Sequence, residues 1–128
     1  MAKPEEKLHF AVADYLKLQY PKVIFISESS GIRMSPGMAK KLKRTRSAHT
    51  HLDLYILEPK GEFSGLIIEL KAVDIYQKKH PELFLKNDHI NDQAATIKAL
   101  NKKGYFATFA IQFDQAKTII DNYLNGSH

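Results

Sequence analysis

Two acidic residues and one lysine are the side chains of this 128-residue chain whose types and spacing best suggest chemistry. The motif Glu69-Leu70-Lys71 ends an apolar segment, and Asp53 lies within an earlier one. Asp53 and Glu69 are equidistant from Gly61, so a hairpin that turns there sets them opposite each other. Opposed side chains on antiparallel strands have Cβ atoms about 4.5–5.5 Å apart, and like charges at that distance are destabilising. The pattern predicts a cation between the two carboxylates.

The alternation of side chains along a strand decides which groups share this site. Glu69 and Lys71 lie on one face of the predicted sheet, whereas Leu70 lies on the other. Two carboxylates and an ammonium then surround one point. Carboxylate oxygens suit a hard cation such as Mg²⁺, which keeps several waters and is usually completed by substrate phosphates. These residue types suggest metal-assisted hydrolysis of a phosphodiester.

Composition narrows the class of protein. A net charge of +5 and a pI near 9.3 favour an anionic partner, although charge alone does not separate nucleic acid from a membrane surface. The absence of cysteine excludes disulfides and thiolate chemistry, and no apolar run reaches the length of a membrane span. We therefore expect one soluble, cytoplasmic domain over residues 1–125. Residues 126–128 resemble the remnant of an expression tag.

Hydrophobic periodicity predicts the elements that position these residues. The expected helices cover residues 5–19, the segment from Asn91 to a cap at Gly104, and a last segment capped by Asp114. The expected strands cover residues 23–26, 52–57, 64–70 and 105–113. Two long polar segments, 27–50 and 73–90, are predicted to be irregular; the first includes at most a helical turn, and the second is a candidate lid. The result is a mixed α/β domain with a small sheet flanked by helices.

The spacing of the charged residues resembles the PD-(D/E)xK nuclease superfamily, and within it the VRR-NUC family, over nearly the whole chain. That family has an early helical Glu, a basic loop, an Asp-Leu, a Glu-x-Lys and a Gln on a following helix. The matching positions are Glu5, the run from Lys40 to Arg46, Asp53-Leu54, Glu69-Leu70-Lys71 and Gln93. Glu6 is an alternative to Glu5. One departure is His49-Thr50-His51-Leu52, where the family usually has Gly and Pro before the Asp.

The resemblance implies a restriction-endonuclease-like core and a set of site residues. Its catalytic residues would be Glu5, Asp53, Glu69, Lys71 and Gln93, although Gln93 is equally well read as a helix-surface residue. One Mg²⁺, replaceable by Mn²⁺, would be held by Asp53, Glu69 and the backbone carbonyl of Leu70. The residues expected to bind phosphate are Lys40, Lys41, Lys43, Arg44 and Arg46. His49 and His51 lack a third ligand at zinc spacing and are read as phosphate or loop contacts.

Two functions from different classes fit this reading. The first is a metal-dependent DNA endonuclease that selects branched or junction DNA, and the resemblance is compatible with a homodimer. The second is a catalytically inactive nucleic-acid-binding module of the same fold. The residue pattern leaves open DNA versus RNA and endonuclease versus exonuclease action.

Overall fold

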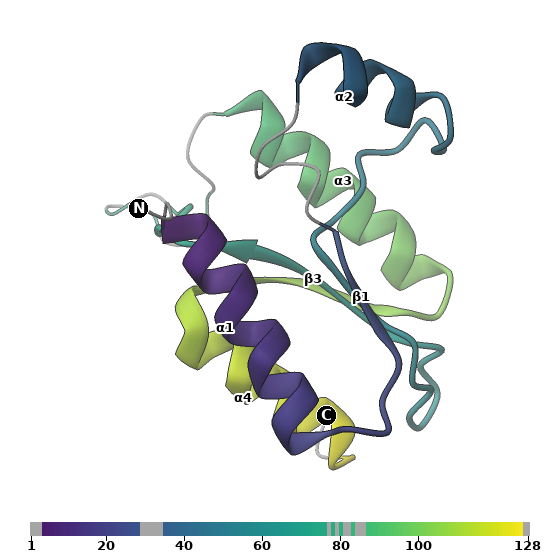
Figure 1. The fold of residues 1–128 in the computed structure, drawn as a ribbon, viewed down its shortest axis with the longest axis vertical. Helices are drawn as coiled ribbons and strands as arrows, with labels where there is room; N and C mark the ends of the chain where they lie inside the picture. Colours follow the sequence, from purple (N-terminus) through teal and green to yellow (C-terminus); the bar gives the residue numbers. More distant parts are fainter. Residues whose placement is uncertain are drawn as a thin grey trace.

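The computed structural model describes residues 4–28, 35–76, 78, 80, 83 and 87–126. Helices and strands follow one another in a mixed order that confirms the predicted α/β class. They are α1 (Pro4–Gln19), β1 (Phe25–Ser27), α2 (Pro36–Lys43), β2 (Leu54–Ile56), β3 (Leu66–Lys71), α3 (Asp88–Lys102), β4 (Phe106–Ile111) and α4 (Gln112–Leu124). Figure 1 shows α1 and α4 side by side on one face of the sheet, with α3 on the other. No described helix is long and apolar enough to cross a membrane.

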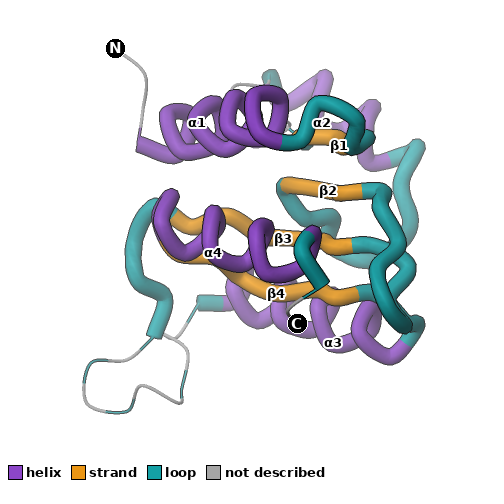
Figure 2. The backbone as a smooth tube through the Cα atoms, turned by 90° about the horizontal axis from the view of Figure 1, so that it is seen from below, coloured by secondary structure: helices purple, strands orange, loops and turns teal. Residues whose placement is uncertain are grey.

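The sheet has the order β1-β2-β3-β4, and Figure 2 shows the four strands in this order, one below another, with α4 in front. β1 pairs with β2, and β2 with β3, in antiparallel fashion, whereas β4 runs parallel to β3. In the central hairpin Leu54 lies opposite Ile68 and Ile56 opposite Leu66. Continued by one residue, this register sets Asp53 opposite Glu69, as the spacing about Gly61 predicted. Gly61 itself adopts φ +56°, a left-handed conformation that glycine adopts without steric cost.

Alternation along β2 and β3 divides the interior into two layers. Even-numbered residues, such as Leu54 and Ile68, are fully buried against α1 and α4 together with Leu16 of α1. Ile67 instead packs on the α3 side, against Leu100. Since Glu69 has the same parity as Ile67, this alternation directs its carboxylate to the α3 side of the sheet.

The strands differ by one to two residues at their ends from the sequence predictions. Three helices, α2, α3 and α4, also differ, and capping side chains explain the first two. α2 is an eight-residue helix in a segment expected to hold at most a helical turn; Ser35 caps it by accepting a hydrogen bond from Met38 N–H at 3.1 Å. α3 begins at Asp88 instead of Asn91, because the Asn87 side chain accepts from the N–H groups of residues 89 and 90. α4 begins at Gln112, so Asp114 lies in its first turn and is not its cap.

The candidate lid can be followed only in part. Residues 77, 79, 81, 82 and 84–86 lie outside the described residues. Before them, Ile75 is buried and packs with Ile90 and Phe109 on the α3 side of the sheet. The chain leaving β3 is therefore anchored to the core beside the start of α3. Phe109 of β4 is buried there.

Candidate active site

The end of β3 that carries Glu69-Leu70-Lys71 lies between the first turns of α1 and α3 (Figure 1). A cavity of about 300 Å³ opens at this point. Its lining includes every residue that the sequence pattern proposed as catalytic, namely Glu5, Asp53, Glu69, Lys71 and Gln93. Five side chains that are up to 88 residues apart in sequence, counting from 5 to 93, therefore meet at one place.

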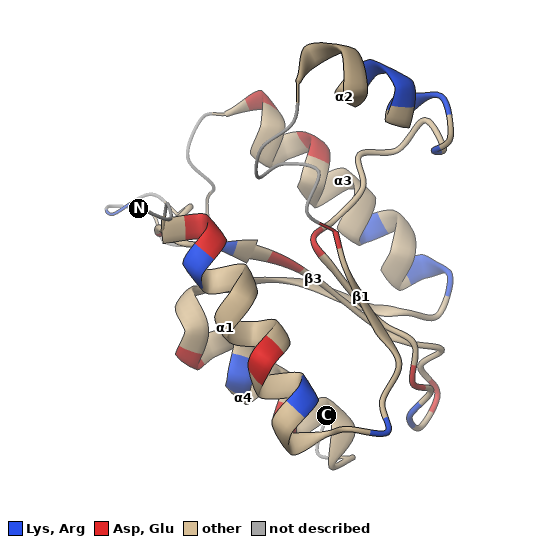
Figure 3. Ribbon diagram, in the orientation of Figure 1, with Lys and Arg blue, Asp and Glu red and all other residues tan. Residues whose placement is uncertain are grey.

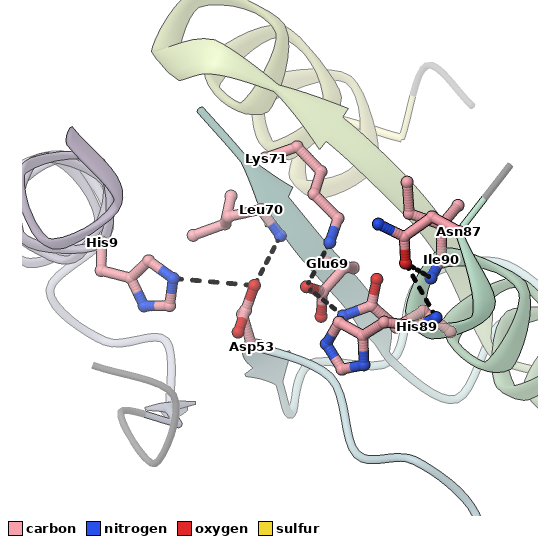
Figure 4. A network of polar contacts seen from close by, with 9 residues as sticks. His9, Asp53, Glu69, Leu70, Lys71, Asn87, His89 and Ile90 are labelled. Atoms are coloured by element: carbon pink, nitrogen blue, oxygen red, sulfur yellow. Dashed lines mark hydrogen bonds and ion pairs between the residues drawn. The ribbon is translucent and has the colours of Figure 1, made fainter. Parts of the chain in front are cut away.

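Asp53 directly precedes β2. Its Oδ2 accepts a hydrogen bond of 2.9 Å from the backbone N–H of Leu70, which lies beyond the last residue of β3 paired with β2 (Figure 4). The N–H and C=O of one strand residue face the same neighbouring strand. The carbonyl of Leu70 is therefore directed toward the same side as the Asp53 carboxylate.

Glu69 is deeply buried, with only 4% of its surface exposed. Its Oε2 accepts a hydrogen bond of 2.8 Å from Gln93 Nε2 and lies 3.5 Å from Lys71 Nζ. Its other oxygen, Oε1, is buried without a hydrogen-bond partner among the described residues, and so is Oε1 of Gln93. Leaving a buried acceptor unsatisfied is costly, so these oxygens indicate a place where a further group binds.

The two carboxyl groups have opposite pKa shifts. Burial raises the pKa of Glu69 to about 9, and the negative charge of Asp53 adds to the increase, while Lys71 acts in the other direction. For Asp53, burial also raises the pKa, but the neighbouring side chains of His9 and Glu69 and the hydrogen bond from Leu70 N–H outweigh it and hold the pKa below its usual value. In the absence of a cation, the pair therefore keeps one proton, on Glu69, at neutral pH.

The donor set fits a hard divalent cation. Asp53, Glu69 and the Leu70 carbonyl supply oxygens only, and the unpartnered Oε1 of Glu69 leaves one of them available. Within the part of the chain that the structure describes, no three His, Asp or Glu side chains form a metal cage by themselves. Mg²⁺ is commonly bound by one or two carboxylates and completed by waters and substrate phosphates, so the set suits it.

Glu5 and Glu6 are separated by their surroundings. Glu5 is exposed and lines the cavity, whereas Glu6 is buried and is not part of the lining. The geometry therefore favours Glu5 as the acidic residue of α1 that faces the site.

Two histidines of this site were not singled out from the sequence. His9 is buried, one turn after Glu5 on α1, and its Nε2 lies 3.6 Å from Asp53 Oδ2 (Figure 4). His89 lies one turn before Gln93 on α3, and its Nε2 is 3.1 Å from Gln93 Nε2. The spacing i, i+4 on helices that carry Glu5 and Gln93 was the available signal. His9 thus contacts one carboxylate of the site directly, whereas His89 contacts Gln93, which holds the other.

The basic run divides into two groups. Lys40, Lys41, Lys43 and Arg44 are exposed on α2 or directly after it, and Figure 3 shows this helix projecting away from the sheet with its cationic end uncovered. Of these residues, only Lys43 lines the cavity.

Arg46 is held differently, since Nη2 pairs with Glu28 at 2.9 Å and Nη1 lies 3.2 Å from both ring nitrogens of His51. Arg46 thus fixes the chain that leads to Asp53. Burial and the charge of Arg46 lower the pKa of His51, so that ring is neutral at pH 7.

The segment that replaces the family's Gly and Pro is held by other contacts. Leu52 is completely buried, and its N–H donates a hydrogen bond of 2.9 Å to the Tyr55 hydroxyl. The departure noted in the sequence therefore leaves Asp53 in position.

The strand order and the helices on both faces of the sheet define a mixed α/β fold, in which an acidic residue lies opposite a Glu-x-Lys strand. Among solved structures, a chain described as "VRR_NUC domain protein" is similar to this one, with a TM-score of 0.65 and 22% sequence identity. The match covers 98% of this chain and 92% of that chain. The VRR-NUC fold predicted from the residue pattern is thereby confirmed. No protein-family model and no curated protein matches the sequence.

Proposed function

We propose that this protein is a metal-dependent nuclease that hydrolyses phosphodiester bonds in DNA. The observation that carries the proposal is the buried Glu69, which lies beside Asp53 with Lys71 at 3.5 Å and with one oxygen unpartnered among the described residues. A buried carboxyl group with an unpartnered oxygen lowers the stability of the folded protein. Carboxyl groups whose pKa values are strongly shifted in a cavity are typical of catalytic sites. The similar fold of a VRR_NUC domain protein supports the same class.

Asp53, Glu69 and the Leu70 carbonyl would hold one Mg²⁺, or Mn²⁺ in its place. Bound there, the cation supplies a water of lowered pKa and neutralises charge that develops on the phosphate. Gln93 holds the Glu69 carboxylate in one orientation through its 2.8 Å hydrogen bond. Lys71 donates to a phosphate oxygen or to the attacking water, because its ammonium lies at the same carboxylate oxygen. Glu5, which is exposed and lines the cavity, would help to hold the ion directly or through water.

The substrate proposal rests on α2. Its exposed residues Lys40 and Lys41 are followed by Lys43, which also lines the cavity, so a phosphate backbone can run from the helix into the site. We propose that Lys40, Lys41, Lys43 and Arg44 bind DNA phosphates, with Arg46 acting mainly to hold the loop. Selection of branched or junction DNA by a homodimer is the finer form of this proposal.

Cleavage of labelled four-way junction, flap, duplex and single-stranded DNA tests the proposal, with Mg²⁺, Mn²⁺ or EDTA. We expect cutting in either metal, none in EDTA, and none by Glu69→Ala or Lys71→Ala. Glu62→Ala is the matched control, since Glu62 is an exposed carboxylate in the turn of the hairpin. Binding without cutting in every metal would instead assign the chain to the inactive nucleic-acid-binding class.

A further inference from the structure

A second cavity, of about 620 Å³, adjoins the candidate active site. The two cavities share three lining residues, Arg46, Thr50 and His51. The second cavity extends along the α3 side of the sheet, between the β1 edge and the last turns of α3. Its position makes it the continuation of the proposed phosphate site, and nothing in the proposed hydrolysis uses it.

The walls of this cavity combine apolar surface with positive charge. Ile26, Tyr55, Ala99 and Leu100 supply an apolar floor, and Ile26 remains 53% exposed. Lys103, the C-cap residue directly after α3, supplies a cation. Glu28 is the carboxylate of the lining, and it is paired with Arg46 at 2.9 Å. An apolar slot with cations beside it is complementary to a nucleotide, whose base is flat and apolar on both faces and whose phosphate is anionic.

The second cavity lies about one nucleotide away from the carboxylates of the candidate active site. Asp53 and Tyr55 are two residues apart in sequence, so their Cα atoms lie at most about 7 Å apart, and the two cavities share Arg46, Thr50 and His51. A nucleotide whose phosphate lies at Asp53 and Glu69 therefore has a base, its own or its neighbour's, within reach of Tyr55. A base in a paired duplex is stacked and cannot enter such a slot unless it is first extruded.

The walls are also fixed before any ligand binds. The Tyr55 hydroxyl accepts a hydrogen bond from Leu52 N–H at 2.9 Å, and the Tyr55 ring packs against the buried cluster of Leu52 and Ile67. Arg46 is held between Glu28 and His51. Rigid aromatic and cationic groups bind with a smaller loss of conformational entropy than mobile ones.

We propose that this second cavity binds one unstacked nucleobase adjacent to the scissile phosphate, so that the preferred substrate carries an unpaired nucleotide at the cut. This inference rests on the proposed nuclease function and names its substrate class. It also assigns specificity to Tyr55, Ala99 and Lys103, which lie outside the set of catalytic residues.

An abasic scan tests the inference. A short single-stranded DNA is prepared in versions that each lack one base, and binding is measured by fluorescence anisotropy in EDTA, while cleavage is measured in Mg²⁺. Stacking on a protein aromatic is worth about 5- to 150-fold in affinity per base. We expect a loss in this range at one position, next to the cleaved bond, and little change elsewhere. Ala99→Phe fills the cavity and should abolish the difference between intact and abasic DNA.

Ala95→Phe is the matched control, because Ala95 is exposed one turn earlier on α3 and does not line the cavity. The abasic scan on the wild-type protein needs no substitution, so it tests the base subsite even if Ala99→Phe fails to fold. Equal sensitivity at every position, or equal behaviour of the two Phe variants, overturns the base subsite while leaving the nuclease in place. Base-sensitive binding without cutting in any metal overturns the nuclease alone. Self-association that only Ala99→Phe prevents, with no base sensitivity, assigns the cavity to a second copy of the chain.

Discussion

The substitution Glu69→Gln should stabilise the metal-free protein at alkaline pH, although it removes a proposed metal ligand. Burial and the charge of Asp53 raise the pKa of Glu69 to about 9 from its usual 4.5. Between these values the folded chain holds a proton that the unfolded chain has released. The free energy of unfolding therefore falls as pH rises through this window, with a limiting slope of about 1.4 kcal/mol per pH unit. Glutamine has the same shape and no charge to bury.

The interval from about pH 7 to about pH 8.5 isolates this effect. The lowered pKa of Asp53 gives it an influence only in acid, where its stabilising contribution is lost as pH falls. The lowered pKa of His51 gives a contribution of the opposite sign, which rises with pH and is complete near neutrality. Of these three groups, only Glu69 changes its contribution over this interval. It lowers the free energy of unfolding of the wild-type protein by at most about 2 kcal/mol.

Urea unfolding followed by circular dichroism measures this slope, since the chain has no tryptophan to serve as a fluorescent probe. In EDTA, wild-type protein should lose stability over the interval, whereas Glu69→Gln should not. Mg²⁺ at about 100 times its dissociation constant should then restore about 2.7 kcal/mol to the wild-type protein and much less to the variant. The exposed Glu62→Gln is the control and should keep the wild-type slope. Equal slopes for wild type and Glu69→Gln would refute the assignment of a buried proton to this group.

Three further predictions follow from the same contacts. His9→Gln should weaken Mg²⁺ binding about 10- to 100-fold, because His9 lies 3.6 Å from Asp53 and orients it. The change is measured by following the stability of the protein at fixed pH as Mg²⁺ is added. An unaltered Mg²⁺ affinity would contradict this role of His9. Replacement of Lys40, Lys41 and Arg44 by Ala should weaken the binding of all DNA sequences alike. Fluorescence anisotropy should show that the slope of log affinity against log salt concentration falls by about 3. An unchanged slope would show that α2 is not part of the DNA interface. Light scattering should give about twice the 14.6 kDa of one chain if a homodimer forms, and a mass of one chain at all concentrations would exclude it.

The central hairpin could be predicted because two local signals agree on it. The turn residues around Gly61 fix the register, and the parity of the apolar residues then fixes which side chains face each helix layer. Asp53, Glu69 and Lys71 were therefore placed correctly relative to one another from the sequence. The family resemblance added Glu5 and Gln93, which also line the cavity, although their helices are distant in sequence.

The residues that were missed depend on tertiary contacts. His9 reaches Asp53 only because α1 lies across the end of the sheet, and no local pattern encodes that crossing. Arg46 was grouped with the exposed cations, since a run of basic residues gives no indication that one of them pairs with Glu28. The base-sized cavity depends in the same way on Tyr55 and α3, which meet only in the folded chain. The starts of α2 and α3 differ from the predicted ones because the prediction did not take into account the capping side chains of Ser35 and Asn87.

The most direct test of the central claim is the time course of cleavage of a labelled flap DNA by wild-type protein and by Lys71→Met, each in Mg²⁺ and in EDTA. Lys71 is mostly buried and lies 3.5 Å from Glu69, so methionine keeps its bulk and removes only the charge. We expect cutting by the wild-type protein in Mg²⁺ alone, and loss of cutting in the variant while DNA binding is retained. Cutting that persists in EDTA, or an equal rate for Lys71→Met, would contradict it.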